Sequence, residues 1–596
     1  MLPVLFFMSC QKELSGEGGA ILPPPVVGPD LTTRITSSIT GFVTNENDAV
    51  VEGATVKAGT ITATTDKYGY FEIKSAQVVK NAAVVTVTKP GYFNGIKTYV
   101  ATENKGAFFR IKLLPKTNGG TVDAASGGTV TLSNGLAVTL PANGVVNAVT
   151  NAAYTGQVNI AAQWLNPVAA DLGKTMPGDL RGLDNSGALK LLTTYGMSAV
   201  ELTGAGGELL QVAPGKKATL NFPLPATVAG AAPATIPLWY FDEAKGLWKE
   251  EGSAVKSGSN YTGEVSHFSY WNCDVPLKDF VTFDLTLKDA TGKSIAGASV
   301  SVKYANGIYT GAHGATDSSG YVKGNIPANT QLIIEVYTDY QCNGPVYTKD
   351  ITTTNAPLSL GTVTLGANNT ATISGNVTDC NSAAVTEGYV IAKIGGDYNY
   401  YRAAVNADGS FSLSTIICGG STAQATIIAV DIATQQQSNP LTKTLTAGNN
   451  TVGILNACGI TVEQFINYSV NGTSYAIVPS GSGSDSLQQY SNPNSTPPTI
   501  SIGGYSMSGG SFKSANLTFT ANSIAANSVQ SLTSFLSSAF PDSSNVTVET
   551  PINVTITEYG AVGEFIAGNF TGTLTGPAPA NTPYNVTCSF RVRREQ

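Results

Sequence analysis

A three-part pattern recurs along the chain and constrains its fold more than any other feature. Its copies span residues 39–71, 285–322 and 373–411. Each copy has an alternating segment, then a segment related to Gly-Ala-x-Val, then a turn that contains Asp and Gly before an apolar or aromatic residue. Asp accepts hydrogen bonds from turn amides, Gly tolerates positive φ, and the next apolar residue starts an inward-facing strand. The pattern predicts a series of small β-sandwiches.

The composition favours the same fold class. Charged residues make up 12% of the chain, against about 25% in typical globular proteins, and Thr, Ser, Asn and Gly fill the difference. Thr and Val suit a pleated surface, whereas the Leu, Glu, Lys and Arg of long helices are scarce. At about 150 residues per domain, the 596 residues correspond to roughly four domains, or five if they are small. We therefore expect an all-β protein of tandem sandwiches.

The repeated skeleton resembles the carboxypeptidase regulatory-like (transthyretin-like) sandwich. The first copy, within residues 37–114, matches best and includes Lys89-Pro90-Gly91-Tyr92 near its end. The second and third copies are looser and also resemble immunoglobulin-like domains. In the peptidases that carry this module it is non-catalytic, so the resemblance implies a fold and no active site.

The segment between the first two copies has a different character. Alternating apolar residues on both sides of 242–246 predict a hairpin that brings Trp239 and Trp248 close together. The segment closes with His-Phe-Ser-Tyr-Trp-Asn, residues 267–272. This order of features resembles the extracellular part of cartilage intermediate layer protein, which implies an extracellular β-domain. We expect His267 to be a packed residue of an aromatic cluster.

The C-terminal region differs from the repeats. Apolar residues at helical spacing predict one helix over 527–540, followed by strand, turn and strand over 554–574. This region resembles the C-terminal β-domains of Bacteroidetes lipoproteins. The predicted fold is thus all-β, with tandem transthyretin-like or immunoglobulin-like sandwiches and a C-terminal β-domain that carries one helix. The predicted divisions are a signal peptide at 1–10, a Pro/Gly-rich tether at 11–36, and domains at 37–115, 116–275, 276–366, 367–459 and 460–596.

The first residues predict export. An apolar run over 2–8 ends in Ser9-Cys10 and is too short to cross a bilayer, which takes about 20 residues. It resembles a signal peptide with the lipobox of bacterial lipoproteins, which implies that Cys10 carries the lipid. Gln11, Lys12 and Glu13 resemble the export signal of Bacteroidetes surface lipoproteins. We expect a lipid-anchored protein on the outer membrane, exposed at the cell surface.

Six cysteines follow Cys10, and an even number in an exported chain predicts disulfides, with fifteen full pairings open. They are Cys273, Cys342, Cys380, Cys418, Cys458 and Cys588. Cys380–Cys418 is the predicted local bridge. Three cysteines in or beside the third repeat imply either a bridge across a domain boundary or a free thiol.

The sequence offers no constellation for catalysis. It contains only two histidines, His267 and His313, and lacks a nucleophile elbow, a zinc-protease motif and a phosphate-binding loop. The net charge of −7 and the absence of a basic stripe argue against nucleic acid. We predict no enzyme activity, cofactor or metal. The Asp turns are interpreted as capped turns rather than calcium loops: Asp66, Asp317 and Asp408.

Two kinds of binding function remain open. Tyr398, Tyr400 and Tyr401 form a candidate aromatic platform for a sugar, although ordinary strand tyrosines explain them equally well. We predict a non-catalytic binding, adhesion or structural protein with an unknown protein or glycan ligand. The alternative is a glycan-binding or accessory component of a polysaccharide-utilisation or other envelope complex.

Overall fold

The computed structural model describes residues 28–594, with gaps at 278, 306–308, 339–341, 343, 396–398, 435, 459, 462–463, 478–485, 507–511, 541–545, 561–564 and 578–580. Cys10, Gln11, Lys12 and Glu13 therefore lie outside the described residues. Strands dominate the described chain, as the composition predicts. Its helical segments are short, and none is long and apolar enough to cross a membrane.

Domain 1 (residues 34–114) is a sandwich of two small sheets, ordered β4-β1-β7 and β3-β2-β5-β6. Its strands are β1 (Arg34–Thr44), β2 (Thr55–Ala58), β3 (Ile61–Thr64), β4 (Tyr70–Val79), β5 (Ala83–Thr88), β6 (Gly95–Tyr99) and β7 (Gly106–Lys112). Strand β1 pairs antiparallel with β4 and parallel with β7. The two sheets enclose a core that includes Ile39, Val56, Phe71 and Val85.

Domains 3 (residues 280–365) and 4 (residues 370–458) repeat this topology. Strand β21 pairs antiparallel with β24 and parallel with β27, and β28 does the same with β31 and β35. Domain 3 contains β21 (Phe280–Lys288), β22 (Ser299–Tyr304), β23 (Tyr309–Ala315), β24 (Tyr321–Pro327), β25 (Gln331–Tyr337), β26 (Tyr347–Thr352) and β27 (Leu358–Thr364). Domain 4 contains β28 (Thr370–Thr378), β29 (Gly388–Ile394), β30 (Tyr400–Ala404), β31 (Ser410–Ile416), β32 (Ala423–Asp431), β33 (Gln436–Gln437), β34 (Leu441–Leu445) and β35 (Gly448–Asn456), with η1 (Ala367–Asn369) before them.

The Asp-Gly turns explain why the pattern recurs. Asp66 accepts hydrogen bonds from the amides of Tyr68 and Tyr70, and Asp317 accepts equivalent bonds from Ser319 and Tyr321. In the third turn Asn406 takes the equivalent position, and Asp408 accepts from the amide and the hydroxyl of Ser410. The glycines that close the turns have φ values of 71°, 77° and 80°: Gly69, Gly320 and Gly409. A Cβ on any of them would lie within 3 Å of a carbonyl oxygen on the first strand of its sandwich. The turn-capping interpretation is confirmed.

Domain 2 (residues 118–277) is built on a 13-stranded sheet. Its strands are β8 (Asn118–Asp123), β9 (Gly128–Thr131), β10 (Ala137–Leu140), β11 (Val145–Asn147), β12 (Gln157–Leu165), β13 (Arg181–Leu183), β14 (Leu189–Gly204), β15 (Leu209–Val212), β16 (Ala218–Pro223), β17 (Thr235–Asp242), β18 (Leu247–Ser257), β19 (Asn260–Val265) and β20 (Tyr270–Leu277), with short helices α1 (Leu172–Thr175) and α2 (Ala226–Ala229). The predicted hairpin is β17–β18, and Trp239 and Trp248 are both fully buried in one cluster.

Domain 5 (residues 460–593) has the strand order β38-β37-β45-β44-β43-β42-β41-β40-β39. The strands are β36 (Ile460–Thr461), which pairs with domain 4, then β37 (Phe465–Val470), β38 (Thr473–Ile477), β39 (Ser486–Asn492), β40 (Thr499–Ser506), β41 (Lys513–Thr520), β42 (Val529–Ser537), β43 (Asn553–Tyr559), β44 (Phe565–Thr575) and β45 (Pro583–Arg593). Strands β43 and β44 match the predicted strand, turn and strand over 554–574.

The predicted helix over 527–540 is wrong, because this segment contains strand β42. Its buried residues are spaced by two, three and two positions: Gln530, Leu532, Phe535 and Ser537. The three-residue step arises from a bulge, since Thr518 lies opposite Ser534 while Phe519 lies opposite Leu532. The apolar residues that suggested a helix, Val529, Leu532, Leu536 and Phe540, do not share one face: Val529 and Leu536 are 57% and 39% exposed, whereas Leu532 and Phe540 are buried.

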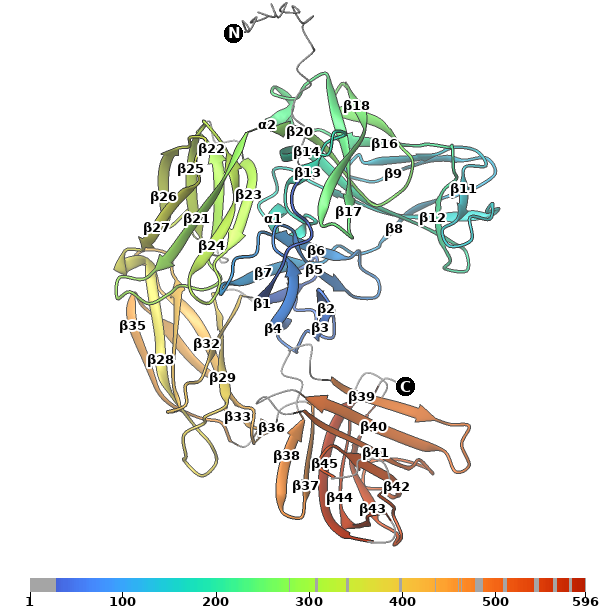
Figure 1. Cartoon of the computed structure of the whole chain (residues 1–596), viewed down its shortest axis with the longest axis vertical. Coiled ribbons are helices and arrows are strands. Elements are labelled where there is room, and N and C mark those ends of the chain that lie inside the picture. Colours follow the sequence, from blue (N-terminus) through green and yellow to red (C-terminus); the bar gives the residue numbers. More distant parts are fainter. Residues whose placement is uncertain are drawn as a thin grey trace, which may run out of the picture.

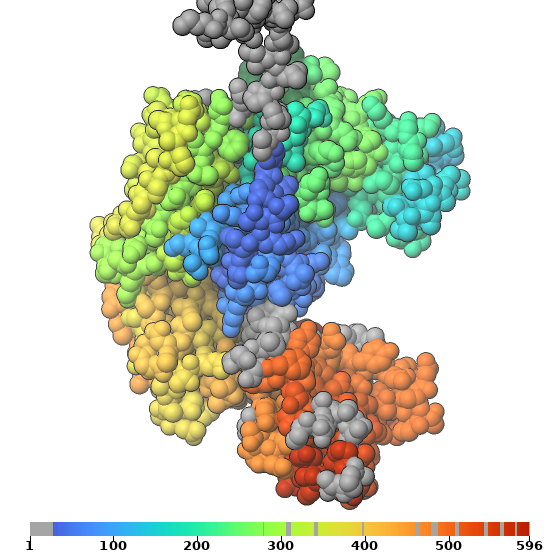
Figure 2. Space-filling model, in the orientation of Figure 1, coloured from blue at the N-terminus to red at the C-terminus, as the bar shows by residue number. Residues whose placement is uncertain are grey.

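The domains do not follow one another in a line (Figure 1). Domain 1 lies in the middle, domains 2 and 3 flank it, and domain 4 returns along its lower side. The sheet of domain 1 continues into domain 3 in the order β26-β25-β22-β23-β7-β1-β4, through Ala315 opposite Phe108. Domain 5 forms a distinct lobe beneath the others (Figure 2).

The predicted disulfide Cys380–Cys418 is wrong. Cys418 bonds instead to Cys342, joining domain 4 to domain 3, and Cys380 bonds to Cys458 within domain 4. Their Cα–Cα distances of 5.3 and 4.9 Å fall in the normal range for disulfides. Sequence separation did not reveal the pairing, because β28 and β35 run parallel and bring the distant Cys380 and Cys458 to neighbouring strand ends.

Candidate functional site: the junction of domains 1, 2 and 3

Domain 1 meets domain 2 through a buried apolar cluster. Phe93 and Ile96 of domain 1 pack with Met176, Trp239 and Tyr270 of domain 2. The Tyr270 hydroxyl donates to the Asn94 carbonyl at 2.9 Å, and burial raises the pKa of this tyrosine. The two domains therefore share a core at this contact.

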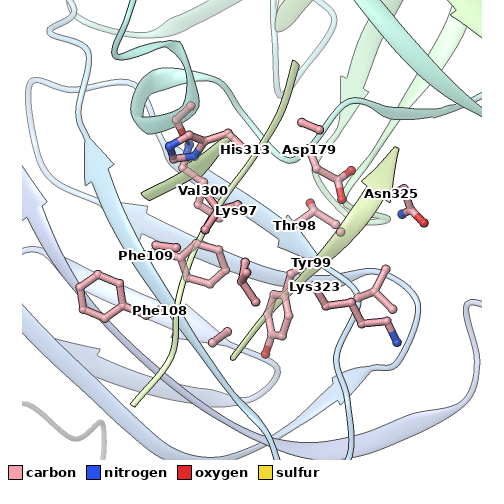
Figure 3. Close-up of a pocket in the computed structure, with 18 of the residues that line it drawn as sticks. Lys97, Thr98, Tyr99, Phe108, Phe109, Asp179, Val300, His313, Lys323 and Asn325 are labelled. Carbon is pink, nitrogen blue, oxygen red and sulfur yellow. Dashed lines mark hydrogen bonds between the residues drawn. The ribbon is translucent and has the colours of Figure 1, made fainter. Parts of the chain in front are cut away.

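Beside this cluster lies a cavity of about 160 Å³, lined by residues of domains 1, 2 and 3 (Figure 3). Lys97, Asp179 and His313 are among its polar side chains, and Phe108 and Phe109 are among its aromatic ones. Such a volume is comparable to an engineered cavity of roughly 150 Å³ that holds benzene. The cavity can therefore admit a small molecule or several waters.

Lys97 on β6 is the most unusual residue of this cavity. Its side chain is 4% exposed, and its Nζ donates to the carbonyls of Gly173 and Met176 at 2.8 and 2.7 Å. Burial lowers the pKa of Lys97 to about 7, and no carboxylate contributes to the shift. An ammonium group has three N–H donors, so one remains beyond these two bonds.

Arg181 on β13 is the second buried cation of the cavity. Its Nε donates to Asp179 at 2.7 Å, and its Nη1 donates to the Asn81 carbonyl of domain 1 at 2.5 Å. Its Nη2 is buried and has no hydrogen-bond partner among the described residues. Burial raises the pKa of Asp179, although the Arg181 charge opposes this shift.

The remaining lining is strongly basic. The described lining contains six Lys or Arg residues and one His, but a single carboxylate, that of Asp179. The basic residues are Lys97, Lys105, Arg110, Lys174, Arg181, Lys323 and His313. Arg110 turns its guanidinium away, since it donates to the Tyr400 carbonyl of domain 4 at 3.2 Å. Basic side chains therefore outnumber carboxylates in the described lining, in a chain whose net charge is −7.

The predicted tyrosine platform is not an exposed sugar-binding surface. Tyr401 is 7% exposed and belongs to the core of domain 4. Tyr400 packs against Phe42 and Tyr68 of domain 1, with ring centroids 6.4 and 5.4 Å apart. Tyr398 lies outside the described residues. The local sequence pattern did not show whether these tyrosines are exposed. Domain 1, which is distant in sequence, covers Tyr400.

The same interface carries a buried cation. The Arg402 guanidinium lies over the rings of Tyr70 and Tyr389, 4.3 and 4.0 Å from their centroids. It also pairs with Glu72 at 3.4 Å. Nearby, burial raises the pKa of Asp66 to about 6. Cation–π contacts gain strength when they are desolvated, so Arg402 joins domains 1 and 4 firmly.

His267 is packed, as predicted. Its ring contacts Tyr240 and Trp271 at centroid distances of 4.7 and 5.1 Å. Burial lowers the pKa of His267, which favours the neutral imidazole. The Trp271 indole donates to the His267 carbonyl at 2.9 Å, so this motif closes domain 2.

Domain 5 presents a different kind of surface. The sheet β39–β42 exposes Tyr490, Tyr505, Phe512 and Leu536, with exposures between 39% and 61%. The cross-strand register places uncharged residues at the outward positions between them: Gln488, Ser501, Gly503, Ser514, Asn516 and Thr518. The rings of Tyr505 and Phe512 stack 6.4 Å apart.

Sequence reasoning missed Lys97 and Arg181. The strand of Lys97, Gly-Ile-Lys-Thr-Tyr, is buried at its first four positions. A lysine in an otherwise uncharged strand was the signal that the sequence offered. Arg181 gave no such signal, because the Asn81 carbonyl that it binds lies a hundred residues earlier in the chain. Asp274 was also missed, although it is fully buried and burial raises its pKa well above the usual value.

Comparison with known proteins gives limited similarity. No protein-family model matches the chain. Cartilage intermediate layer protein 2 of mouse is 36% identical over 106 residues, which is 18% of this chain and 9% of that protein. The human protein is 31% identical over 121 residues, covering 20% of this chain and 10% of its own length. This chain thus spans about a tenth of these curated relatives.

Solved structures with some likeness include two bacterial pilins and a protein of Bacillus anthracis. The streptococcal ancillary pilin is 11% identical with a TM-score of 0.14, covering 39% of this chain and 96% of its own. The shaft pilin SpaA of Lactobacillus rhamnosus GG is 12% identical with a TM-score of 0.16, covering 30% and 99%. The Bacillus anthracis TIE protein is 10% identical with a TM-score of 0.14, covering 80% and 69%. Similarity this low does not transfer a function.

Proposed function

We propose that this protein is a non-catalytic, lipid-anchored component of the bacterial outer surface that presents domain 5 on a rigid body. The observation that carries the proposal is the central position of domain 1. Its contacts with domains 2, 3 and 4 are buried and partly charged, as at Lys97, Phe108 and Arg402. Such contacts fix the relative positions of four domains, which suits a structural or adhesive role.

Export is supported by two disulfides. Bridges persist in oxidising compartments and are rare in the cytosol. Cys342–Cys418 and Cys380–Cys458 both lie in the body of domains 3 and 4. In this proposal Cys10 carries the lipid, and residues 11–36 connect it to domain 1. The free Cys273 and Cys588 are buried and serve as core residues.

Protease treatment of intact cells tests surface display. Cells that express the full chain should lose the signal of a domain 5 antibody within minutes, while a periplasmic marker stays intact. Cys10→Ser should release the protein from the membrane fraction, whereas Cys273→Ser should leave it there. Full protection of the wild-type chain in intact cells would exclude surface display.

A second candidate function is binding of a neutral glycan, favoured by the outer face of domain 5. Aromatic rings stack on sugar rings, and neutral hydroxyls and amides bond to sugar hydroxyls. Tyr490 lies opposite Ser501, four residues before Tyr505, so the two rings are about 13 Å apart along the strands. This length suits an oligosaccharide better than a single sugar.

A glycan array with the full chain tests this candidate. Binding to neutral oligosaccharides should weaken about tenfold or more in Tyr490→Ala, since one stacked ring contributes on the order of 1–2 kcal/mol. Tyr92→Ala in domain 1 is the matched control. A blank array, or equal binding by the two variants, would remove the glycan role and leave the structural one.

A further inference from the structure

The cavity between domains 1, 2 and 3 contains two buried cations that lack a complete set of partners. Lys97 is 4% exposed and bonds only neutral carbonyls. Arg181 is 3% exposed, and its Nη2 has no partner among the described residues. Buried charges in proteins are normally paired, and a buried donor without an acceptor destabilises the folded state. Both observations indicate a missing acceptor with negative charge.

The lining does not supply that acceptor. Among the described lining residues Asp179 is the only carboxylate, and both of its oxygens already accept from Arg181, at 3.2 Å from the backbone amide and 2.7 Å from Nε. Lys105 lies over the Tyr321 ring at 5.0 Å, and the His313 imidazole is 3.3 Å from the Ser299 hydroxyl. Neither of these contacts brings a negative charge to Lys97 or to Arg181.

We propose that this cavity binds a small oxyanion, either an inorganic anion or the carboxylate of a small ligand. A volume of about 160 Å³ accommodates one such group and excludes a polymer. Oxyanions offer several lone pairs to N–H donors from different directions, and charge-assisted bonds to Lys and Arg are about twice as strong as neutral ones. Half-exposed residues such as Lys174 and Lys323 mark its rim, which leaves a route for entry.

Such a ligand would act between domains rather than within one. Lys97 belongs to domain 1, Arg181 to domain 2 and His313 to domain 3. An anion held by all three stabilises the assembled junction by mass action, because it binds the folded junction and not the separated domains. This inference is independent of surface display and of the glycan face on domain 5.

Titration calorimetry of the full chain tests the proposal with sodium sulfate, sodium phosphate and sodium acetate in separate runs at constant ionic strength. At least one of them should bind saturably at one site per chain. A preference for acetate indicates a carboxylate ligand, and a preference for sulfate or phosphate indicates an inorganic anion. Absence of saturable binding for all three would overturn the proposal.

Two variants and one control locate the site. Lys97→Met should weaken binding about ten- to a hundredfold, as expected for loss of one charge-assisted bond. Arg181→Lys keeps a positive charge but removes Nη2, and should weaken binding as well. Lys57→Met, on the exposed face of β2, should bind like the wild type. Equal affinity in all four proteins would assign the binding to a surface ion elsewhere and contradict the proposal.

Discussion

Domains 1 and 5 are both β-structures with apolar cores, but they are attached to the rest of the chain in different ways. Domain 1 shares buried groups with three neighbours, including the Phe93 and Ile96 cluster and the Arg402 stack. Domain 5 meets domain 1 through the ion pair of Arg593 and Glu52, whose side chains are 36% and 33% exposed. A cleft of about 660 Å³ lies between domains 4 and 5.

The two domains therefore differ in how much of their surface is available to a binding partner. Neighbouring domains cover parts of domain 1, at the Phe93 and Ile96 cluster and at the Arg402 stack. Domain 5 keeps the outer face of β39–β42 uncovered. Domains 1–4 should therefore unfold together, whereas domain 5 should unfold as its own unit.

The largest expected effect comes from the bridge between domains 3 and 4. The double change Cys342→Ser and Cys418→Ser opens a loop closed across 76 residues, which costs about 4 kcal/mol by chain entropy. Scanning calorimetry should show the transition of domains 1–4 at lower temperature, with that of domain 5 unchanged. An unchanged main transition would mean that domain 3 and domain 4 are not coupled there.

Arg402→Met should have the next largest effect. The change removes two cation–π contacts and leaves Glu72 without its cation at a buried interface, which costs about 3 kcal/mol. Lys393→Met on the neighbouring strand β29 provides a control for the loss of one charge. If both variants melt alike, Arg402 does not hold domain 1 to domain 4.

Lys97 predicts a pH effect of intermediate size at the junction. Its pKa is about 7 in the folded protein and 10.5 in the unfolded chain, so between these values the unfolded state binds more protons. Stability therefore rises with pH through this window, by about 2 kcal/mol between pH 7 and pH 9. Denaturation of wild type and Lys97→Met at both pH values isolates this contribution. The facing groups Asp179, Arg181 and His313 are present in both proteins. Equal pH slopes would contradict the prediction.

The smallest effect is expected at the contact between domains 1 and 5. Arg593→Ala removes an ion pair whose partners are about one-third exposed, and such pairs contribute below about 1 kcal/mol. Neither calorimetric transition should move by more than a few degrees. A shift as large as that of Arg402→Met would make domain 5 part of the rigid body.

The sequence predicted what depends on local chemistry. The turns with Asp and Gly, and the hairpin with Trp239 and Trp248, were predicted correctly because neighbouring residues determine them. The helical spacing of Val529, Leu532 and Leu536 misled, because Val529 and Leu536 lie on the exposed face of β42 and Leu532 on its buried face, with a bulge that shifts the alternation by one residue. Local propensity does not distinguish a bulged strand from a helix when only a few apolar residues are present.

Contacts between domains could not be predicted from the sequence for a different reason. Tyr400 looked available because Phe42 and Tyr68, which cover it, lie more than 300 residues earlier in the chain. The pairing of Cys342 with Cys418 depends on the same packing of separate domains. The cavity of Lys97 and Arg181 requires three domains at once, so no single segment carries its signature.

The most direct test of the account is scanning calorimetry of the full chain, with and without Arg402→Met. If domain 1 holds domains 2–4 as one body, the wild type shows two transitions, and the variant lowers the larger one alone. Four or five independent transitions in the wild type, with the variant altering only that of domain 4, would contradict the central role of domain 1.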